Sequence, residues 1–201
     1  MELKGSKTEQ NLMTAFAGEA QANTRYRLFA DAARQDGYAW LSAIFEDISE
    51  QELAHAAIWL DKLGEIGRTA ANLATAVDGE TYEYTDMYQR FAREAEEDGF
   101  PALAEKFRAV GKIEECHARL FQNLLTRLEG GTLFESPTET LFRCENCGYT
   151  HTGHSAPEHC PVCGYPRGYF HEIAADEWPE DAPMTGAEPP LLRPEGTQAD
   201  T

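Results

Sequence analysis

Apolar residues recur at intervals of three and four in four successive stretches between residues 8 and 129. This spacing places them along one side of an α-helix. Gly37 separates the first stretch from the second, and Gly99 separates the third from the fourth, with Pro101 at a favourable first-turn position of the last helix. The pattern therefore predicts an all-α four-helix bundle built from two helix hairpins.

The two predicted hairpins are related by an internal repeat, since Gly18-Glu19 is echoed by Gly79-Glu80. Only residues 64–68 connect the hairpins. Five residues reach about 17 Å at most, whereas a helix of 28 residues is about 42 Å long. The connection is too short to run along the bundle. We therefore expect either a simple up-down-up-down bundle or an exchange of hairpins between two copies of the chain, and we favour the exchange, which makes a homodimer.

Carboxylates and imidazoles interrupt the apolar stripe of every predicted helix. Burying an ionised carboxylate costs several kcal/mol unless it is paired, and four carboxylates in one core would repel each other without cations. A Glu from each of two helices, with Glu-x-x-His from each of the other two, is the ligand pattern of a dinuclear site inside a bundle. The predicted ligands are Glu19, Glu52, His55, Glu80, Glu114 and His117.

Glu83 departs from the repeat, because it lies one helical turn beyond Glu80 whereas its counterpart in the first repeat is Ala22. A carboxylate at this position that faced the site would offer one metal ion an additional ligand. The alternative is a surface glutamate without a role.

Four cysteines form two Cys-x-x-Cys-Gly motifs, Cys144–Cys147 and Cys160–Cys163, with 12 residues between them. This spacing is a strong signal for a tetrahedral four-thiolate site in a small domain of strands and loops. The glycines allow backbone N–H groups to turn toward the sulfurs and stabilise their negative charge. The spacing does not decide between iron and structural zinc.

Composition limits the remaining possibilities. The chain of 201 residues has room for one bundle and a small module, and its formal charge of −18 argues against binding of nucleic acid. No apolar run is long enough to span a membrane, and no secretory signal follows Met1, so we expect a cytoplasmic protein. We assign residues 1–135 to the bundle, 136–171 to the metal domain and 172–201 to an acidic, proline-rich tail that is mostly disordered.

On its motifs, the chain resembles the rubrerythrin family over about residues 5–171. The motifs that carry the resemblance are Gly18-Glu19, Glu52-x-x-His55, Gly79-Glu80-x-x-Glu83, Tyr84-Thr85-Asp86-Met87-Tyr88, Glu114-x-x-His117 and the two cysteine motifs. The family joins a ferritin-like di-iron bundle to a rubredoxin-like domain. The resemblance therefore implies two non-haem irons in the bundle and a third iron held by Cys144, Cys147, Cys160 and Cys163.

The resemblance also implies a role for each ligand of the bundle. Glu52 and Glu114 would bridge the two irons. Glu19 would hold one iron together with either Glu83 or His55, because in the family this iron moves between the two positions on reduction.

The other iron would be held by Glu80 and His117. Tyr26, one repeat away from Tyr88, matches a tyrosine that lies near the site in the family, so we count it among the candidate catalytic residues.

The implied function is reduction of hydrogen peroxide to water in oxidative-stress defence, with electrons relayed through the four-cysteine iron from a rubredoxin or an NADH-dependent flavoprotein. Two alternatives stay open. One is a ferroxidase or iron-storage protein, against which the rubredoxin-like domain weighs, because oxidation of iron needs no electron supply. The other is a redox sensor whose four cysteines bind structural zinc.

Overall fold

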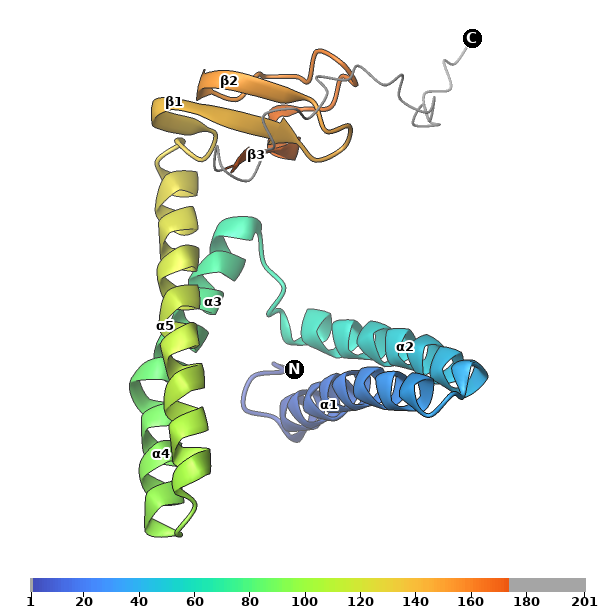
Figure 1. Cartoon of the computed structure of the whole chain (residues 1–201). Coiled ribbons are helices and arrows are strands. Elements are labelled where there is room, and N and C mark those ends of the chain that lie inside the picture. The colour runs from blue at the N-terminus through green and yellow to red at the C-terminus, as the bar shows by residue number, and fades with distance from the viewer. Residues whose placement is uncertain (1, 174–201) are drawn as a thin grey trace. The chain divides into compact units, whose positions relative to one another are not determined.

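The computed structural model describes residues 2–173. The elements, in chain order, are α1 (Lys7–Gln35), α2 (Ala39–Leu63), α3 (Thr69–Tyr82), the π-helix η1 (Glu83–Met87), α4 (Tyr88–Glu97), α5 (Pro101–Glu129), β1 (Glu135–Cys144), β2 (Thr150–Ser155), the 3-10 helix η2 (Arg167–Tyr169) and β3 (Phe170–Ile173) (Figure 1). The predicted fold class, a duplicated helix hairpin followed by a small β module, is confirmed. Among the described residues, none of the helices combines the length and apolar character that crossing a membrane requires.

The chain divides into two compact units, of which the first ends at Thr75 and the second begins at Ala76. The boundary between these units falls inside α3, and the predicted domain bounds stay a prediction. The sheet begins at Glu135 and ends at Ile173, so it includes one residue that we assigned to the bundle and two that we assigned to the tail. The rest of the predicted tail lies outside the described residues.

In the first hairpin, α1 and α2 pack against each other through small side chains. The buried residues of α2 are Ser42, Ser49 and Ala56, which are seven residues apart and therefore lie on one face of the helix. Ala30 is the buried residue of α1. Asn23 donates from its side-chain amide to both the carbonyl oxygen (2.8 Å) and the hydroxyl (2.9 Å) of Ser49, which fixes the two helices at the middle of their contact.

The second hairpin repeats this packing between α4 and α5. The buried residues of α5, Ala104, Gly111 and Ala118, are the repeat equivalents of those in α2. Gly111 is required for the close approach, because a Cβ atom at this position would lie 3.1 Å from the Cβ of Tyr88. Both hairpins thus use the smallest side chains where the helices are closest.

The turns of the two hairpins also match. Gly37 and Gly99 have φ angles of 86° and 83°, in the left-handed region that favours glycine. In each hairpin, the backbone N–H after the glycine donates to a carbonyl in the last turn of the preceding helix, at 2.8 Å for Tyr38 and 2.7 Å for Phe100. The prediction of turns at both glycines is confirmed.

Large apolar residues of the predicted core stripes remain exposed. Phe29, Leu41, Ile48 and Leu103 are between 36% and 47% exposed. Because small side chains fill the contact between the two helices of a hairpin, the large ones on the same side are left for contacts with other helices. A hairpin by itself therefore does not bury these residues, and their burial in the core of a four-helix bundle stays a prediction.

A π-helix interrupts the third predicted helix, which the structure divides into α3, η1 and α4. The segment from Glu80 to Gly99 is one residue longer than the equivalent segment from Glu19 to Gly37. The π-helix accommodates one extra residue, with the N–H of Tyr88 donating to the carbonyl of Glu83 five residues earlier. π-helical turns are frequent at functional sites, and this one begins at the glutamate that departs from the repeat.

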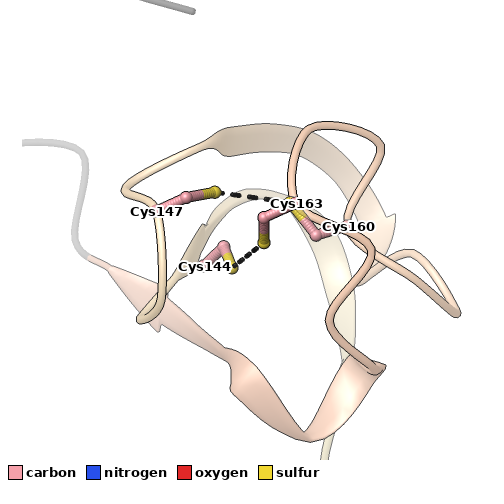
Figure 2. Close-up of side chains that lie close together, drawn as sticks. All are labelled: Cys144, Cys147, Cys160 and Cys163. Atoms are coloured by element: carbon pink, nitrogen blue, oxygen red, sulfur yellow. Dashed lines mark hydrogen bonds between the residues drawn. The ribbon is translucent and has the colours of Figure 1, made fainter. Parts of the chain in front are cut away.

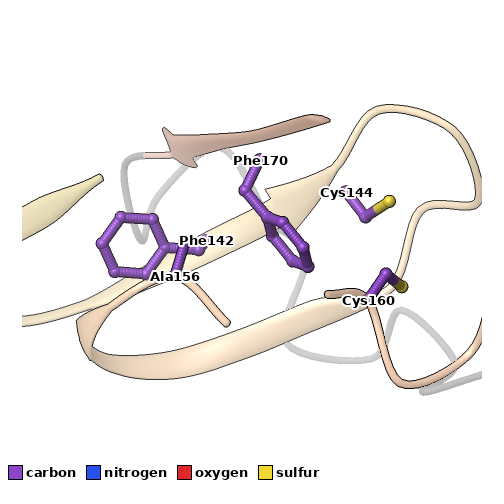
Figure 3. Packing of buried hydrophobic residues seen from close by; sticks show 5 residues of the cluster. All are labelled: Phe142, Cys144, Ala156, Cys160 and Phe170. Atoms are coloured by element: carbon purple, nitrogen blue, oxygen red, sulfur yellow. The ribbon is translucent and has the colours of Figure 1, made fainter. Parts of the chain in front are cut away.

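The β module is a three-stranded antiparallel sheet with strand order β2-β1-β3. Its core contains the buried residues Phe142, Cys144, Ala156, Cys160 and Phe170 (Figure 3). Two of the predicted metal ligands are therefore part of this core, so a metal ion bound by them would also hold the module together.

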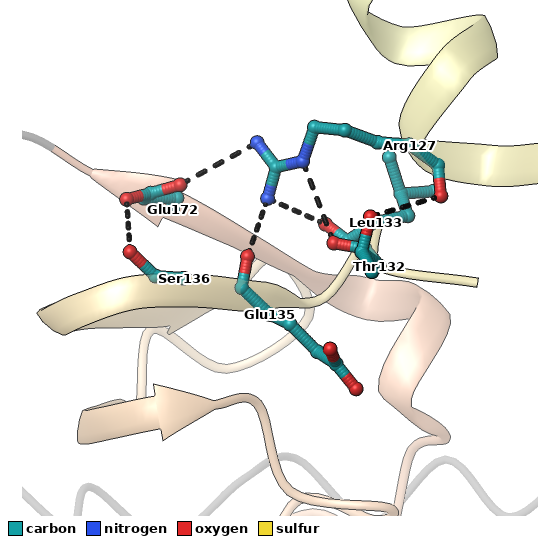
Figure 4. A network of polar contacts seen from close by, with 6 residues as sticks. All are labelled: Arg127, Thr132, Leu133, Glu135, Ser136 and Glu172. Carbon is teal, nitrogen blue, oxygen red and sulfur yellow. Dashed lines mark hydrogen bonds and ion pairs between the residues drawn. The ribbon is translucent and has the colours of Figure 1, made fainter. Parts of the chain in front are cut away.

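Arg127, in the last turn of α5, joins this helix to the β module (Figure 4). Its guanidinium donates to the carbonyl oxygens of Leu133 (3.1 Å) and Glu135 (2.8 Å). It also forms an ion pair of 3.6 Å with Glu172 of β3, whose carboxylate accepts a hydrogen bond of 3.3 Å from Ser136. One side chain thus contacts the linker, β1 and β3.

We predict that Arg127→Gln loosens this junction. Hydrogen bonds to a charged group contribute about 1.5–3 kcal/mol each, so losing them would accelerate amide hydrogen exchange across residues 132–136 by about tenfold or more. Arg119→Gln is a matched control, because Arg119 lies on the exposed surface of α5 and pairs with Glu115 of the same helix. Equal exchange rates in the two variants would contradict the role given to Arg127.

Candidate metal centres

The first hairpin brings Glu19 of α1 together with Glu52 and His55 of α2, and we call these three residues the first half-site. One potential ligand atom from each lies within 4.8 Å of the others. The Nδ1 atom of His55 is 3.2 Å from a carboxylate oxygen of Glu52 and 3.9 Å from one of Glu19. The two residues of α2 converge because they are three positions apart on one helix face.

The second hairpin brings together Glu80, Glu114 and His117 in the same way, and these form the second half-site. The Nδ1 atom of His117 is 2.7 Å from a carboxylate oxygen of Glu114 and 3.5 Å from one of Glu80. The half-sites lie in different compact units. Their union in one dinuclear centre therefore stays a prediction.

The carboxylates within each half-site lie close enough together to shift each other's pKa. The hydrogen bond between Glu19 and Glu52 raises the pKa of Glu19, with burial adding to the rise, and lowers the pKa of Glu52. The charge of Glu52 also contributes to the raised pKa of Glu19, so a cation bound between the two carboxylates would relieve their repulsion.

In the second half-site, burial raises the pKa of Glu80, and the charge of Glu114 adds to the rise. One oxygen of Glu80 is buried and has no hydrogen-bond partner within the described part of the chain. A bound cation would satisfy this oxygen, so the residues present fit a metal site.

Glu83 lies in the first position of η1, next to the second half-site. Its charge contributes to the raised pKa values of Glu80 and Tyr88, for both of which burial is the larger cause. Glu83 is not among the three residues whose ligand atoms lie within 4.8 Å of one another. Its role as an additional ligand stays a prediction.

The candidate residue Tyr26 and its repeat equivalent Tyr88 occupy matching positions in the two hairpins. Tyr26 packs against Phe45, with ring centroids 6.1 Å apart, and Tyr88 packs against Phe107 at 6.2 Å. Each tyrosine thus contacts the neighbouring helix of its own hairpin through an aromatic pair.

The four predicted cysteine ligands converge at one end of the β module (Figure 2). The sulfur of Cys144 is 3.8 Å from that of Cys163, and the sulfur of Cys147 is 3.6 Å from that of Cys160. In a tetrahedral site with metal–sulfur bonds of about 2.3 Å, the sulfurs are about 3.8 Å apart. The geometry therefore fits a single tetrahedral metal ion.

Backbone N–H groups and one side chain act on the sulfurs. Burial raises the pKa of Cys147 to about 12, although a hydrogen bond from the backbone of Tyr149 opposes the rise. Burial would also raise the pKa of Cys163, but hydrogen bonds from the backbone of Tyr165 and the side chain of Asn146 lower it to about 6. The backbone N–H groups can turn toward the sulfurs because Gly148 and Gly164 both have a φ angle of 75°, as expected.

Sequence reasoning did not single out Asn146. Its position inside the first Cys-x-x-Cys motif was the available signal, because the two residues between such cysteines lie in the loop that surrounds the sulfurs.

Comparisons with known proteins agree with both kinds of centre. The family model described as rubrerythrin matches residues 10–125, and the one described as the rubredoxin-like domain of rubrerythrin matches residues 142–171. A rubrerythrin of Porphyromonas gingivalis is 42% identical over 85% of this chain and 92% of its own length. One from Nitratidesulfovibrio vulgaris is 40% identical over 88% of this chain and 98% of its own length.

A solved structure of nigerythrin in a mixed-valence state is 29% identical and covers 83% of this chain and 86% of that chain, with a TM-score of 0.31. This superposition is too loose to support conclusions about the arrangement of the helices.

We predict that Glu80→Gln stabilises the metal-free protein at neutral pH. Because the pKa of Glu80 is raised in the folded state, a larger fraction of Glu80 is protonated there than in the unfolded chain. The free energy of unfolding therefore falls as the pH rises from the pKa of the unfolded chain, about 4.3, through the pKa of the folded protein. Glutamine does not titrate and avoids this loss. The stabilisation should be greatest at pH 7–8 and disappear below about pH 4.

Urea unfolding followed by circular dichroism between pH 4 and pH 8, with a chelator present, measures this effect. Glu97→Gln is the control, because Glu97 is an exposed carboxylate at the end of α4. If Glu80→Gln had the same effect at every pH, the proposed cost of ionising Glu80 in the folded protein would be wrong.

Proposed function

Because the chain belongs to the rubrerythrin family, we propose that it reduces hydrogen peroxide to water at a di-iron site, with electrons entering through a rubredoxin-like iron site. The resemblance seen in the motifs is confirmed by these matches. The Glu/His groups of both half-sites and the four converging cysteines provide for the two kinds of iron centre. The observation that carries the proposal is the presence of both donor sets in one chain.

Bound iron would supply the two electrons that convert one hydrogen peroxide molecule and two protons into two water molecules. The glutamates and histidines would hold the ions, since carboxylates and imidazoles are suitable iron ligands. Tyr88 keeps its phenolic proton, because burial and then the charge of Glu83 raise its pKa. It can therefore donate a hydrogen bond beside a group of acidic ligands.

The four-cysteine centre is the feature that favours a reductase. An enzyme that consumes peroxide must be supplied with electrons repeatedly, whereas a ferroxidase obtains them from its iron substrate. Arg127 ties the module that carries these cysteines to α5, the helix that carries Glu114 and His117. We propose a reduced rubredoxin or an NADH-dependent flavoprotein as the external donor and the cytoplasm as the location, where thiols remain reduced.

We further propose that the active form is a homodimer. The large apolar residues on the half-site faces, such as Leu41 and Leu103, are exposed and need a partner surface. The half-sites belong to different compact units, joined by a connection of five residues between α2 and α3. A hairpin from a second copy of the chain has an apolar face of the same kind, which could cover the exposed face of the first copy. This contact would bring a first and a second half-site together.

We predict that the purified protein, loaded with iron under anaerobic conditions, contains about three irons per chain and consumes hydrogen peroxide faster than it consumes oxygen. Glu83→Ala should lower peroxide turnover by about tenfold or more, because it removes a predicted ligand. Peroxide consumption is measured with a supplied rubredoxin and reductase, and Glu97→Ala serves as the control.

Faster reaction with oxygen than with peroxide would favour a ferroxidase over the proposed reductase. Two irons and one zinc per chain would remove the internal electron relay. Unchanged turnover in Glu83→Ala would mean that this carboxylate is not a ligand that the reaction needs.

We predict that Leu41→Glu prevents assembly of the dimer, because it places a charge on the exposed apolar face of the first hairpin. Leu41 lies three turns before Glu52, so the half-site itself stays intact. Native mass measurement should show a monomer, and iron analysis should show about one iron per chain with the visible absorption of the four-cysteine centre retained. A dimer with three irons per chain would refute the proposed interface.

A further inference from the structure

Trp59 distinguishes the first half-site from the second. It follows His55 by four residues and Glu52 by seven, so it lies on the same face of α2 as both predicted ligands. The repeat-equivalent residue on α5 is Phe121, which follows His117 by four residues. The two aromatic residues differ in one chemical respect that matters here: only the indole has an N–H donor.

The indole nitrogen of Trp59 is covered by protein and has no hydrogen-bond partner of normal geometry among residues 2–173. Such a buried donor costs free energy when it is left unpaired, and the N–H of a buried tryptophan usually finds an acceptor. The nearby acceptor is Glu19, because Trp59 lies one turn beyond His55, whose Nδ1 atom is 3.9 Å from a carboxylate oxygen of Glu19. In agreement with this placement, Trp59 lowers the pKa of Glu19, against the larger opposing effect of Glu52.

The second half-site has no such donor at the equivalent position. One buried oxygen of Glu80 makes no hydrogen bond among the described residues, although the Nδ1 atom of His117 is 3.5 Å away, and the phenyl ring of Phe121 offers no donor. The two half-sites therefore match in their predicted ligands and differ in what supports the first glutamate of each.

We propose that Trp59 is a positioning residue that donates its indole N–H to the Glu19 carboxylate oxygen that does not bind metal, and so holds Glu19 as a ligand through a single oxygen. The proposal rests on the di-iron site of the proposed function. A ligating carboxylate uses one oxygen for the metal and leaves the other to a hydrogen-bond donor outside the ligand set, and such donors fix the orientation of the ligand. The unpaired indole N–H of Trp59 is such a donor, since Trp59 is not among the predicted ligands.

The test is Trp59→Phe in the full-length, metal-free protein, titrated with Co²⁺. Phenylalanine keeps most of the ring and reproduces the residue that the second repeat has naturally, so the change removes the N–H and little else. We expect one of the two Co²⁺ ions held by carboxylates and histidines to bind about 10–100-fold more weakly. The other ion, and the Co²⁺ bound by the cysteines, should bind as in the unchanged protein.

The infrared spectrum gives a readout that packing alone would not change. The splitting between the symmetric and antisymmetric carboxylate stretches distinguishes a carboxylate bound through one oxygen from one bound through two, and we expect Trp59→Phe to shift one such band in the Co²⁺-loaded protein. Phe121→Leu is the matched control, since it alters an aromatic residue at the equivalent position without removing a donor. It should leave the carboxylate bands unchanged.

A measurement on the unchanged protein supports the same conclusion independently. The indole ¹H–¹⁵N resonance of Trp59, assigned by its absence in Trp59→Phe, should move downfield when Zn²⁺ fills the site, because a stronger hydrogen bond to Glu19 deshields the proton.

Equal Co²⁺ affinities and identical carboxylate bands in Trp59→Phe and the unchanged protein would overturn the proposal. So would an equal weakening of both ions together with a lower melting temperature of the metal-free variant, which would assign Trp59 to packing. If the unchanged protein bound Co²⁺ only through its cysteines, the di-iron site would itself be wrong. That outcome is distinguishable, because it is seen before any variant is compared.

Discussion

The cost of placing ionised carboxylates on apolar helix faces is the constraint on which the rest of the structure depends. The cost is visible in the pKa values: the hydrogen bond with Glu52, and then burial, raise the pKa of Glu19, and burial raises the pKa of Glu80. A bound cation would offset this cost and satisfy the unpaired oxygen of Glu80. Metal binding and the stability of both hairpins are therefore linked, since the same side chains that destabilise the metal-free helices are the ligands.

The use of small side chains inside each hairpin explains why the chain contains two of them. The face of α2 that carries Ser42, Ser49 and Ala56, like its equivalent in α5, brings two helices close together but buries little apolar area. The large residues remain on the outer part of the stripe, beside the ligands, where they can be buried only against further helices. In the proposed dimer, a single hairpin would supply half of the ligands and half of the core, and one association would complete both.

Features set by local sequence could be predicted, and features set by packing could not. The turns at Gly37 and Gly99 follow from a positive φ that few other residues adopt, and the four-cysteine site follows from spacing within two short loops. The apolar stripes were also predicted, but periodicity identifies a helix face and not the surface that covers it, so the exposure of these residues in a single chain could not be predicted. The π-helix left a signal, the extra residue between Glu80 and Gly99, whose consequence for helix geometry we did not draw. Tight contacts such as Gly111 against Tyr88 depend on distances that the sequence does not contain.

Duplication supplies the ligands, and departures from it make the two metal positions unequal. The second repeat has Glu83 and the π-helix that begins at this residue, whereas the first has the indole donor of Trp59 beside Glu19. Both differences act on the surroundings of the carboxylates and leave the Glu-x-x-His pairs alike. Two ions in such surroundings would have different affinities and different reduction potentials, because hydrogen bonds and nearby charges tune a bound metal. If the centre receives single electrons from the four-cysteine iron and uses two in each reaction, as proposed, its two positions would be reduced in a defined order, which an exact repeat could not provide.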